Sequence, residues 1–394
     1  MKILCVFGQH NYGDPRRGTC IEYDAFIPAL RSLGHEVHFF EARNAKIYPN
    51  YATLNCALLD AVEEIQPEIL FTVQRDYELW IETISAIRAR GVLAITWTTD
   101  DSWKFREVSR FIAPVYDAVA TTYKYRLEDY LRCGMPNAIL SQWATNSSWL
   151  RPPRPFKDCK YPVSFVGMKY GQRCRIIEKL QKAGISVYCF GYGWPAGTVT
   201  AEQIPEIFNQ SAISLNFAAS SRLFSNENQV KARTFEAPGA GTLLLTDVAP
   251  GLEQYYEIGK EIDAYENIPQ LIEKIQMYLK NPQLRDRVAR AGYERTVYSH
   301  TYENRLRELM EAVKDIKRQV PPDGPDPATL QKCHVLTPTL RLLRAATCMP
   351  MCFIWGEHRG MRVARRLTFE FSWRIFGQKT FTAVGLPGRM YPMV

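Results

Sequence analysis

Short apolar runs of four to six residues recur along most of the chain, and stretches with helical periodicity separate them. Continuous apolar runs of this length, alternating with helices, are typical of parallel strands that helices cover on both faces. The pattern fails near residues 145–161 and then restarts, so it predicts two successive doubly wound α/β domains. Strands are predicted at Ile3–Phe7, Glu36–Phe40, Ile69–Val73, Val92–Trp97, Ala118–Thr121, Ala138–Ser141, Val163–Val166, Val187–Phe190, Ala212–Phe217 and Thr242–Leu245.

Proline-rich segments divide this pattern. The run Arg151–Pro155 cannot continue a helix or a central strand, and Pro321–Pro325 marks a second boundary. We therefore expect a Rossmann-like domain over 1–148, a linker over 149–161, a second such domain over 162–320 and an extension over 321–394. Ligands of open α/β sheets bind beyond the carboxyl ends of the strands, so the expected site is a cleft across which the two domains face each other. Helices are predicted at Thr19–Leu33, Ala52–Ile65, Tyr77–Arg90, Lys124–Arg132, Arg173–Lys182, Ile268–Leu279, Pro282–Val297 and Thr301–Arg318.

Composition narrows the class of protein. Hydrophobic residues make up 46% and charged residues 23% of the chain, which is the balance of a globular protein. There is no run of about 18 apolar residues, and the first strand is followed at once by polar residues rather than by a secretory signal. These features predict a cytoplasmic location. The cysteines form no Cys-x-x-Cys pair and lie largely in apolar runs, so reduced structural thiols are expected rather than disulfides or a metal site.

The net charge of +8 is concentrated at the end of the chain, because residues 321–394 hold ten Lys or Arg against four Asp or Glu. The remaining body is nearly neutral, which argues against nucleic acid as a partner. Two explanations of the extension remain open: peripheral contact of 326–394 with the anionic inner face of the membrane, or a helical layer on the N-terminal domain. Both rest on arginines interleaved with large apolar residues, namely Arg341, Arg344, Arg362, Arg365, Arg366, Arg374, Leu340, Leu342, Leu343, Phe353, Trp355, Phe369, Phe371 and Trp373.

The segment Gln229–Asp247 carries the most informative chemistry. If its helix starts near Val230, then Lys231 and Arg233 lie in the first turn, where the helix dipole opposes each cation by roughly 0.3–1 kcal/mol. Backbone amides and two basic side chains can together neutralise a diphosphate, and Glu236 lies one turn on, placed to accept hydrogen bonds from ribose hydroxyls. The alternative is an ordinary surface helix with a charged face and a glycine-capped end.

The segments Phe235–Ala237 and Gly241–Asp247 resemble the C-terminal domain of CgeB-like glycosyltransferases, within the group 1 (family 4) class of GT-B enzymes. The resemblance covers roughly residues 160–310 and continues through Pro250–Leu252, Gly259–Glu261 and Asn281–Pro282. It ends at Ser299–Arg305, which is similar to the family's HTYxxR signature. The N-terminal half resembles the family more loosely.

The resemblance implies a GT-B fold and a glycosyltransferase that moves a sugar from a nucleoside-diphosphate sugar to a hydroxyl acceptor with retention of configuration. It implies no cofactor beyond this co-substrate, and the acceptor is expected to be a saccharide, a lipid-linked group or a protein hydroxyl. In the family the second of two glutamates binds ribose, which assigns Glu236, together with Gly241 and Thr242 of the adjoining motif, to the donor. The position of the first glutamate is occupied by Asn228, with Glu227 beside it.

Three other segments supply candidates. The loop Gly167–Arg173 joins a strand to a helix, so Lys169 and Arg173 are expected to hold phosphate, unless the loop is merely an exposed basic one. The loop Gly8–Gly18 lacks the dinucleotide and P-loop fingerprints. Related enzymes bring such a loop close to the donor, which implicates Gly13. His10 is a catalytic candidate, with simple packing as the alternative.

Asp100 and Asp101 stand between two tryptophans at the end of a predicted strand, where adjacent carboxylates repel each other. They are catalytic candidates that contact sugar; the alternatives are a helix cap formed by Asp101 and a metal site. No Asp-x-Asp ends a strand of the body, whereas Lys169, Arg173, Lys231 and Arg233 can neutralise a departing diphosphate. We therefore expect no metal ion. Two other functions remain open: a GT-B-fold sugar-nucleotide epimerase, and a non-catalytic protein that binds sugar nucleotides or polysaccharides.

Overall fold

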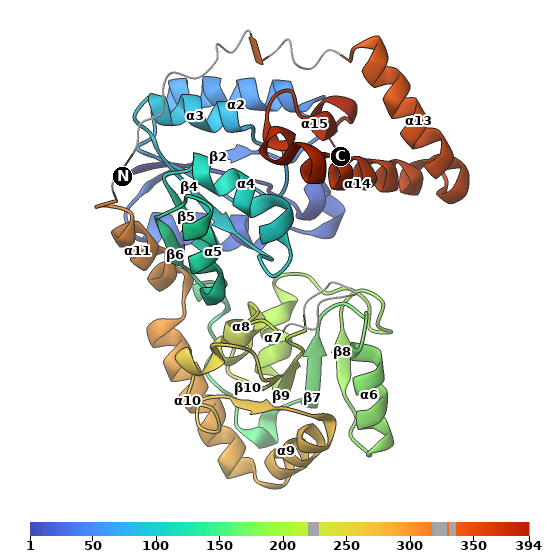
Figure 1. Cartoon of the computed structure of the whole chain (residues 1–394). Helices are drawn as coiled ribbons and strands as arrows, with labels where there is room; N and C mark the ends of the chain where they lie inside the picture. Colours follow the sequence, from blue (N-terminus) through green and yellow to red (C-terminus); the bar gives the residue numbers. More distant parts are fainter. Residues whose placement is uncertain (220–227, 317, 319–328, 331–335, 394) are drawn as a thin grey trace. The chain divides into compact units, whose positions relative to one another are not determined.

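A computed structural model describes residues 1–219, 228–316, 318, 329–330 and 336–393. The chain divides into two compact units: unit 1 comprises Met1–Ser141 with Arg307–Val394, and unit 2 comprises Gln142–Leu306. Each unit has a parallel sheet flanked by helices (Figure 1). The predicted α/β class with two Rossmann-like domains is confirmed.

The sheet of unit 1 has six parallel strands in the order β2-β1-β3-β4-β5-β6. Strand β1 lies between β2 and β3, so that Cys5 is paired with Phe39 on one side and with Phe71 on the other. Because most of these side chains are buried on both faces, the strands appear in the sequence as continuous apolar runs. The bounds are β1 Lys2–Phe7, β2 Glu36–Glu41, β3 Ile69–Thr72, β4 Leu93–Thr98, β5 Ala118–Thr121 and β6 Ala138–Leu140.

The helices of unit 1 follow the predicted order with one clear difference. The predicted helix Tyr77–Arg90 begins only at Ile81, because the buried side chain of Asn55 holds the preceding backbone in place. Its amide donates to the Glu78 carbonyl and its oxygen accepts from the Trp80 N–H, at 2.9 Å each. The bounds are α1 Ile27–Ser32, α2 Tyr51–Ile65, α3 Ile81–Ala89, α4 Arg110–Ile112, α5 Leu127–Arg132, α13 Pro338–Trp355, α14 Glu357–Phe376 and α15 Leu386–Met390, with π-helical turns Glu22–Phe26 before α1 and Phe105–Ser109 before α4.

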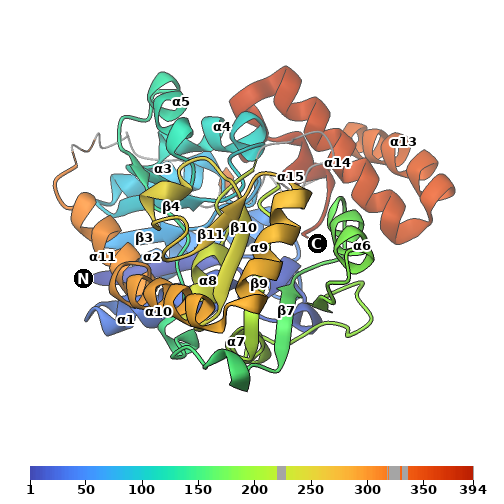
Figure 2. The ribbon, with the colours of Figure 1, turned by 90° about the horizontal axis from the view of Figure 1, so that it is seen from below.

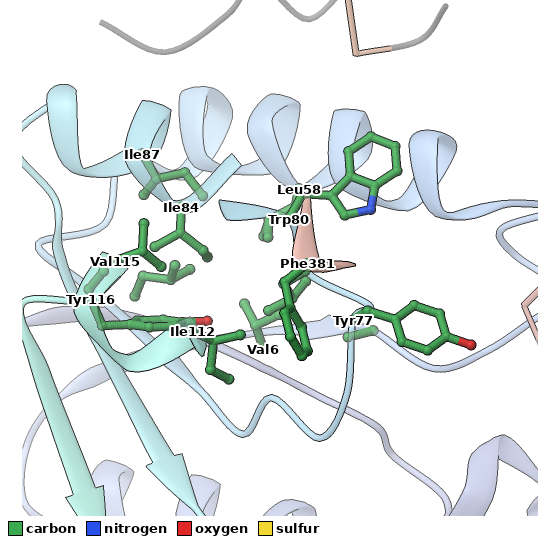
Figure 3. Close-up of a cluster of buried hydrophobic side chains, with 14 of the residues drawn as sticks. Val6, Leu58, Tyr77, Trp80, Ile84, Ile87, Ile112, Val115, Tyr116 and Phe381 are labelled. Carbon is green, nitrogen blue, oxygen red and sulfur yellow. The ribbon is translucent and has the colours of Figure 1, made fainter. Parts of the chain in front are cut away.

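The C-terminal extension supplies part of the core of unit 1. Phe369 and Trp373 of α14 and the following Phe381 are buried in the cluster that also contains Val6 and Tyr77. Figure 3 shows Phe381 among the side chains of this cluster, near Val6 and Ile112. The helical-layer explanation of the extension is therefore correct for α14. Packing against unit 1 removes its aromatic side chains from contact with water, which stabilises this arrangement.

The sheet of unit 2 has five parallel strands in the order β11-β10-β9-β7-β8. Alternate residues face opposite sides: Leu243 and Leu245 join one core cluster, and Leu244 joins the other. The bounds are β7 Tyr161–Val166, β8 Tyr188–Phe190, β9 Ser211–Asn216, β10 Leu243–Asp247 and β11 Asp263–Tyr265. The short strand β11 was not among the predicted strands.

Helices cover both faces of this second sheet. Side chains of α6, α9 and α10 contribute to one core cluster, and side chains of α7 and α8 to the other. Figure 2 shows α9 and α10 beside each other in this unit. The bounds are α6 Arg173–Lys182, α7 Gln203–Asn209, α8 Arg233–Gly239, α9 Ile268–Lys280, α10 Pro282–Ser299 and α11 Tyr302–Ala312.

The compact units differ from the predicted domain ranges. Residues of the predicted linker 149–161 pack within unit 2, where the N–H of Arg151 donates to the Gly239 carbonyl and that of Phe156 to the Asp286 carboxylate. Unit 2 therefore begins at Gln142. Its last residue, Leu306, lies inside α11, so the rest of that helix belongs to unit 1. The predicted boundary Pro321–Pro325 lies outside the described residues.

Within the described part of the chain, no helix is both long enough and apolar enough to cross a membrane.

Candidate functional site

The order of the strands locates the ligand-binding edge of each unit. In both sheets the first strand lies beside the third, β1 beside β3 and β7 beside β9, and this is where the chain reverses its direction of winding. In open parallel sheets such a switch point leaves room for a ligand beyond the carboxyl ends of the strands. The loops that follow β1, β3, β7 and β9 are therefore the places where binding residues are expected.

The loop after β7 is held in shape by a neighbouring turn. The indole N–H of Trp194 donates to the Gly167 carbonyl at 2.8 Å, and the N–H of Lys169 donates to the Tyr192 carbonyl, also at 2.8 Å. Gly191 has φ +125°, and a Cβ atom there would lie 2.5 Å from the Gly167 carbonyl oxygen. Glycine is therefore required at position 191 for this turn to support the loop.

Lys169 and Arg173 lie on this loop in different environments. Lys169 is exposed, with its ammonium 5.3 Å from the centre of the Trp194 ring. Arg173 is buried, and its Nη1 donates to the Met168 carbonyl at 2.9 Å. Burial lowers the pKa of Arg173 to about 10, and the positive charge of Arg233 acts in the same direction. The loop thus holds one exposed cation and one desolvated cation.

Arg233 opens helix α8 and lies close to the same loop. Its Nη2 is 3.1 Å from where a Cβ atom of Gly167 would stand, so glycine at 167 makes this approach possible. Its guanidinium lies 5.9 Å from the centre of the Phe165 ring, and that of Arg173 lies 5.4 Å from it. Burial also lowers the pKa of Arg233. Neither guanidinium forms an ion pair with a carboxylate among the described residues, although the charges of Glu236 and Asp247 act on Arg233 and Arg173 respectively, so the two form a partly desolvated positive site.

Glu236 lies in the first turn of α8, because the helix begins at Arg233 rather than near Val230. Burial raises the pKa of its carboxyl group to about 7, although Arg233 acts in the opposite direction. This carboxyl group makes no hydrogen bond to any residue that the structure describes. A largely buried carboxyl group without such a hydrogen bond is costly in free energy unless water or a ligand supplies the partner.

Three neighbouring residues complete this edge. Lys231 precedes α8 instead of lying in its first turn, because the helix begins at Arg233 and not near Val230; its Nζ donates to the Ala219 carbonyl at 2.6 Å. Asp247 ends β10, accepts a hydrogen bond from the Ala218 N–H, and has its pKa raised to about 6 by burial. Asn228 donates to the Val248 carbonyl at 2.7 Å. Its neighbour Glu227 lies outside the described residues.

Gly241 and Thr242 were predicted to bind the donor, and the structure contradicts this. Helix α8 runs antiparallel to the strands, so its end and the following turn lie at the amino edge of the sheet, opposite Arg233. A Cβ atom at Gly241 would lie 2.6 Å from the Arg151 carbonyl, and Thr242 donates to the Ser211 carbonyl at 2.9 Å. Both residues therefore serve packing within unit 2.

In unit 1 the loop after β1 contains His10 and Gly13. Gly13 has φ +69°, and a Cβ atom there would lie 2.4 Å from the Arg43 carbonyl, so this glycine packs against the chain after β2. The Nδ1 atom of His10 is buried and has no hydrogen-bond partner in the described part of the chain. His10 thus stays a candidate for contact with a ligand, whereas Gly13 shapes the loop.

Asp101 is buried completely, which contradicts its predicted contact with sugar and both alternatives. One oxygen accepts from Thr98, Thr121 and Tyr130, and the other accepts from Ser109, all at 2.6–2.7 Å. Four hydroxyl donors compensate the buried charge, so Asp101 ties β4 to β5 and α5. The sequence pattern did not predict these hydrogen bonds, because it does not show that the side chain of Asp101 points into the core.

Asp100 has a different environment. It is half-buried and has φ +58°, a left-handed conformation that is uncommon for residues other than glycine. Its carbonyl accepts hydrogen bonds from the N–H groups of Trp103 and Lys104, which fixes the turn after β4. Strained backbone of this kind clusters at functional sites, so Asp100 remains a candidate.

The sequence reasoning missed an ion pair at the same edge of unit 1. Arg75, which follows β3, donates to the buried Glu22 at 2.6 Å, and the negative charge of Glu22 raises the pKa of Arg75. Asp100 acts on Arg75 in the same direction. The sequence contains one signal for this ion pair, namely a charged residue just after the end of a buried strand. No group of three or more His, Cys, Asp or Glu side chains that could hold a metal ion occurs among the described residues.

Two Rossmann-like domains, each with a parallel sheet, and basic residues at the switch point of unit 2 are features expected of a GT-B protein. Residues 172–311, somewhat more than a third of the chain, match the family model described as "Glycosyl transferase-like". This match and the fold confirm the predicted enzyme class, a glycosyltransferase.

Solved structures with the same fold have low sequence identity to this chain. The sucrose-phosphate synthase of Thermosynechococcus elongatus is 13% identical with a TM-score of 0.54, and the comparison covers 79% of this chain and 98% of that one. Anabaena HepE in complex with UDP and glucose is 10% identical with a TM-score of 0.56, covering 79% and 99%. A glycosyltransferase of Rickettsia africae is 15% identical with a TM-score of 0.54, covering 80% and 98%. The search of curated protein sequences found no match.

The buried carboxyl of Glu236 makes the stability of unit 2 depend on pH. Its pKa in the folded state, about 7, lies above the ordinary value of 4.5, so the stability contributed by the protonated form is complete below 4.5 and is lost as the pH rises through 7. We expect the free energy of unfolding of Glu236→Gln, taken relative to that of the parent, to be roughly 1–3 kcal/mol higher at pH 8.5 than at pH 5.5. Urea denaturation at both pH values measures this.

The exposed Glu178 of α6 provides the control, since Glu178→Gln should unfold with the pH dependence of the parent. An identical pH dependence of Glu236→Gln and the parent would contradict the burial of an unpartnered carboxyl group.

Proposed function

We propose that this glycosyltransferase takes its sugar from a nucleoside-diphosphate donor held at the carboxyl edge of unit 2 and transfers it to a hydroxyl group. The observation that carries the proposal is the pair Arg173 and Arg233, two partly desolvated guanidiniums without a carboxylate partner among the described residues. A diphosphate supplies the missing charge, and arginine binds phosphate oxygens through two parallel hydrogen bonds.

The surrounding residues support the same donor. Lys169 is exposed and lies on the same loop as Arg173. Glu236, one turn after Arg233, is assigned to the ribose hydroxyls, which would replace the hydrogen bonds that its carboxyl lacks. HepE, which has the same fold, is described in complex with UDP and with UDP-glucose, which makes UDP the first nucleotide to test.

The finer assignment follows the resemblance to CgeB-like enzymes: transfer with retention of configuration and without a divalent metal. Fixed cations can neutralise the departing diphosphate in place of a metal ion. His10 and Asp100 are the proposed contacts to the reacting sugars in unit 1, because the first has a buried nitrogen without a described partner and the second a strained backbone. Sugar-nucleotide epimerisation and binding without turnover are the alternatives that the assay below separates.

The donor site predicts the effect of a single substitution. Arg233→Ala removes a charged donor, so UDP binding should weaken by roughly 1.5–3 kcal/mol, which is about 10- to 150-fold in Kd. Isothermal titration calorimetry with UDP measures this. Arg175→Ala, on the exposed side of α6, removes the same side chain outside the site and should leave the Kd unchanged. Equal affinities of the parent and Arg233→Ala for UDP and GDP alike would refute the site.

The reaction predicts a product of defined stereochemistry. With labelled UDP-sugars and candidate acceptors, we expect transfer that continues in excess EDTA, and NMR of the anomeric proton should show the configuration of the donor. Loss of activity in EDTA that Mn²⁺ or Mg²⁺ restores would contradict metal independence. An inverted product would place the enzyme in another class, whereas an epimerised donor or binding without turnover would favour one of the alternatives.

We also propose that the outer surface of α13 rests on an anionic membrane. The side chains of Leu342, Met349 and Phe353 are 73%, 70% and 93% exposed, which is unusual for large apolar residues. The helix also carries the exposed Arg341, whose charge complements anionic lipid. Large apolar and basic side chains exposed together are typical of helices that lie in the interface of a bilayer. This contact would bring the enzyme to a lipid-linked acceptor.

If α13 contacts the membrane, the double variant Phe353→Ser with Trp355→Ser should bind vesicles less well than the parent. The measurement is the fraction of protein that sediments with vesicles of phosphatidylcholine and phosphatidylserine. High salt should lower it as well, since part of the attraction is electrostatic. Leu131→Ser removes a side chain of α5 that is 63% exposed and should not affect sedimentation. Absence of binding by the parent, or equal binding by the double variant, would refute the contact.

A further inference from the structure

Unit 1 contains a cavity of about 230 Å³ whose wall is rich in arginine. Arg362, Arg365 and Arg366 line it from α14, and Arg43 lines it from the chain after β2. Positions 362, 365 and 366 share one face of a helix, because residues three and four apart lie side by side. Four arginines thus line one small space.

Most of this positive charge is not compensated. Arg366 pairs with Glu107 at 2.6 Å and with Glu370, but Arg43, Arg362 and Arg365 form no ion pair with any described carboxylate. Like charges at i and i+4, as in Arg362 and Arg366, destabilise a helix by roughly 0.2–0.5 kcal/mol. An anion that enters the cavity would offset this repulsion.

The two carboxylates that line the cavity do not fill this role. Both oxygens of Glu78 accept backbone hydrogen bonds at 2.7 Å, from the N–H groups of Arg75 and Asp76. The carboxylate of Asp76 lies 3.9 Å from the ammonium of Lys104. Since Arg366 is already paired with Glu107 and Glu370, three arginines without an ion pair to a described carboxylate face these two acids, and the balance of charge is positive.

Two tyrosines add neutral hydrogen-bonding groups to the lining of the cavity. Tyr51 and Tyr77 line it beside Phe369, with their rings 5.4 Å apart. Burial raises the pKa of Tyr51 to about 12 and that of Tyr77 well above its ordinary value, so both hydroxyls stay protonated at neutral pH. An entering anion would therefore meet hydroxyl groups as well as guanidiniums.

The position of the cavity connects it with the reaction. Arg43 follows β2 and Asp76 follows β3, so the cavity lies at the carboxyl edge of the sheet, where ligands of such domains bind. Its volume is below the range of roughly 300–1,000 Å³ that is usual for whole drug-sized ligands. It therefore suits one small charged group of a larger molecule.

From this geometry we infer that the arginine cavity of unit 1 binds a phosphate group of the acceptor. The inference rests on the proposed function, in which unit 1 receives the acceptor. Arginine side chains converging from two elements are the usual means of recognising phosphate. The extension then has a role beyond packing, because α14 supplies three of the four arginines.

The test is calorimetric titration of the full chain, saturated with UDP so that the donor site is occupied. The probes are inorganic phosphate, glucose 6-phosphate and octyl phosphate. Arg362→Gln with Arg365→Gln should weaken binding of these probes about tenfold or more, and so should Arg43→Gln, which acts from a different element and does not depend on α14. The control is Arg359→Gln with Arg132→Gln, which removes the same charge from exposed positions of unit 1 and should bind as the parent does.

The three probes separate the sources of phosphate. Tighter binding of glucose 6-phosphate would identify a phosphorylated saccharide, and tighter binding of octyl phosphate a lipid phosphate; either supports the inference. Equal binding by the parent and by both cavity variants would overturn it, as would absence of binding by the parent. UDP titration of the same proteins tests the donor site separately, since the cavity variants should retain the Kd of the parent for UDP.

Discussion

Parallel pairing of every strand is the constraint on which the arrangement of both units depends. Because all strands of a sheet run in one direction, each connecting helix must run back along a face, and all strand ends meet at one edge. This brings the loop after β7 and the start of α8 together in unit 2, and the ends of β2 and β3 in unit 1. The same constraint sends Gly241 and Thr242 to the opposite edge of the sheet from Arg233.

At these edges several charged side chains form no ion pair with a described residue of the protein. Arg173 and Arg233 share the Phe165 ring without a described carboxylate partner, and Glu236 is buried beside them with a raised pKa. Desolvated groups of this kind cost stability in the free protein. Asp101 shows the contrasting case, because four hydroxyl groups satisfy its carboxylate and leave nothing for a ligand.

The C-terminal extension combines structural and binding features in a single helix. The same face of α14 carries Phe369 and Trp373, which are buried in the core of unit 1, and Arg362 and Arg365, which line the cavity. The packed aromatic residues fix the position of the arginines, since a close-packed core leaves little freedom to shift. Donor binding in unit 2 and recognition of an acceptor phosphate in unit 1 would then each rest on arginines held by buried aromatic side chains.

The sequence by itself determined the α/β class, most strands and the proximity of Arg233 to Glu236, because burial periodicity and spacing within one helix are local properties. It did not determine that α8 begins at Arg233, that Asp101 points inward or that Tyr77–Trp80 lies outside helix α3. Only the tertiary structure brought Arg173 to Arg233 and Arg43 to Arg362. Such neighbours depend on strand order and on packing between distant segments, which no local pattern of residues records.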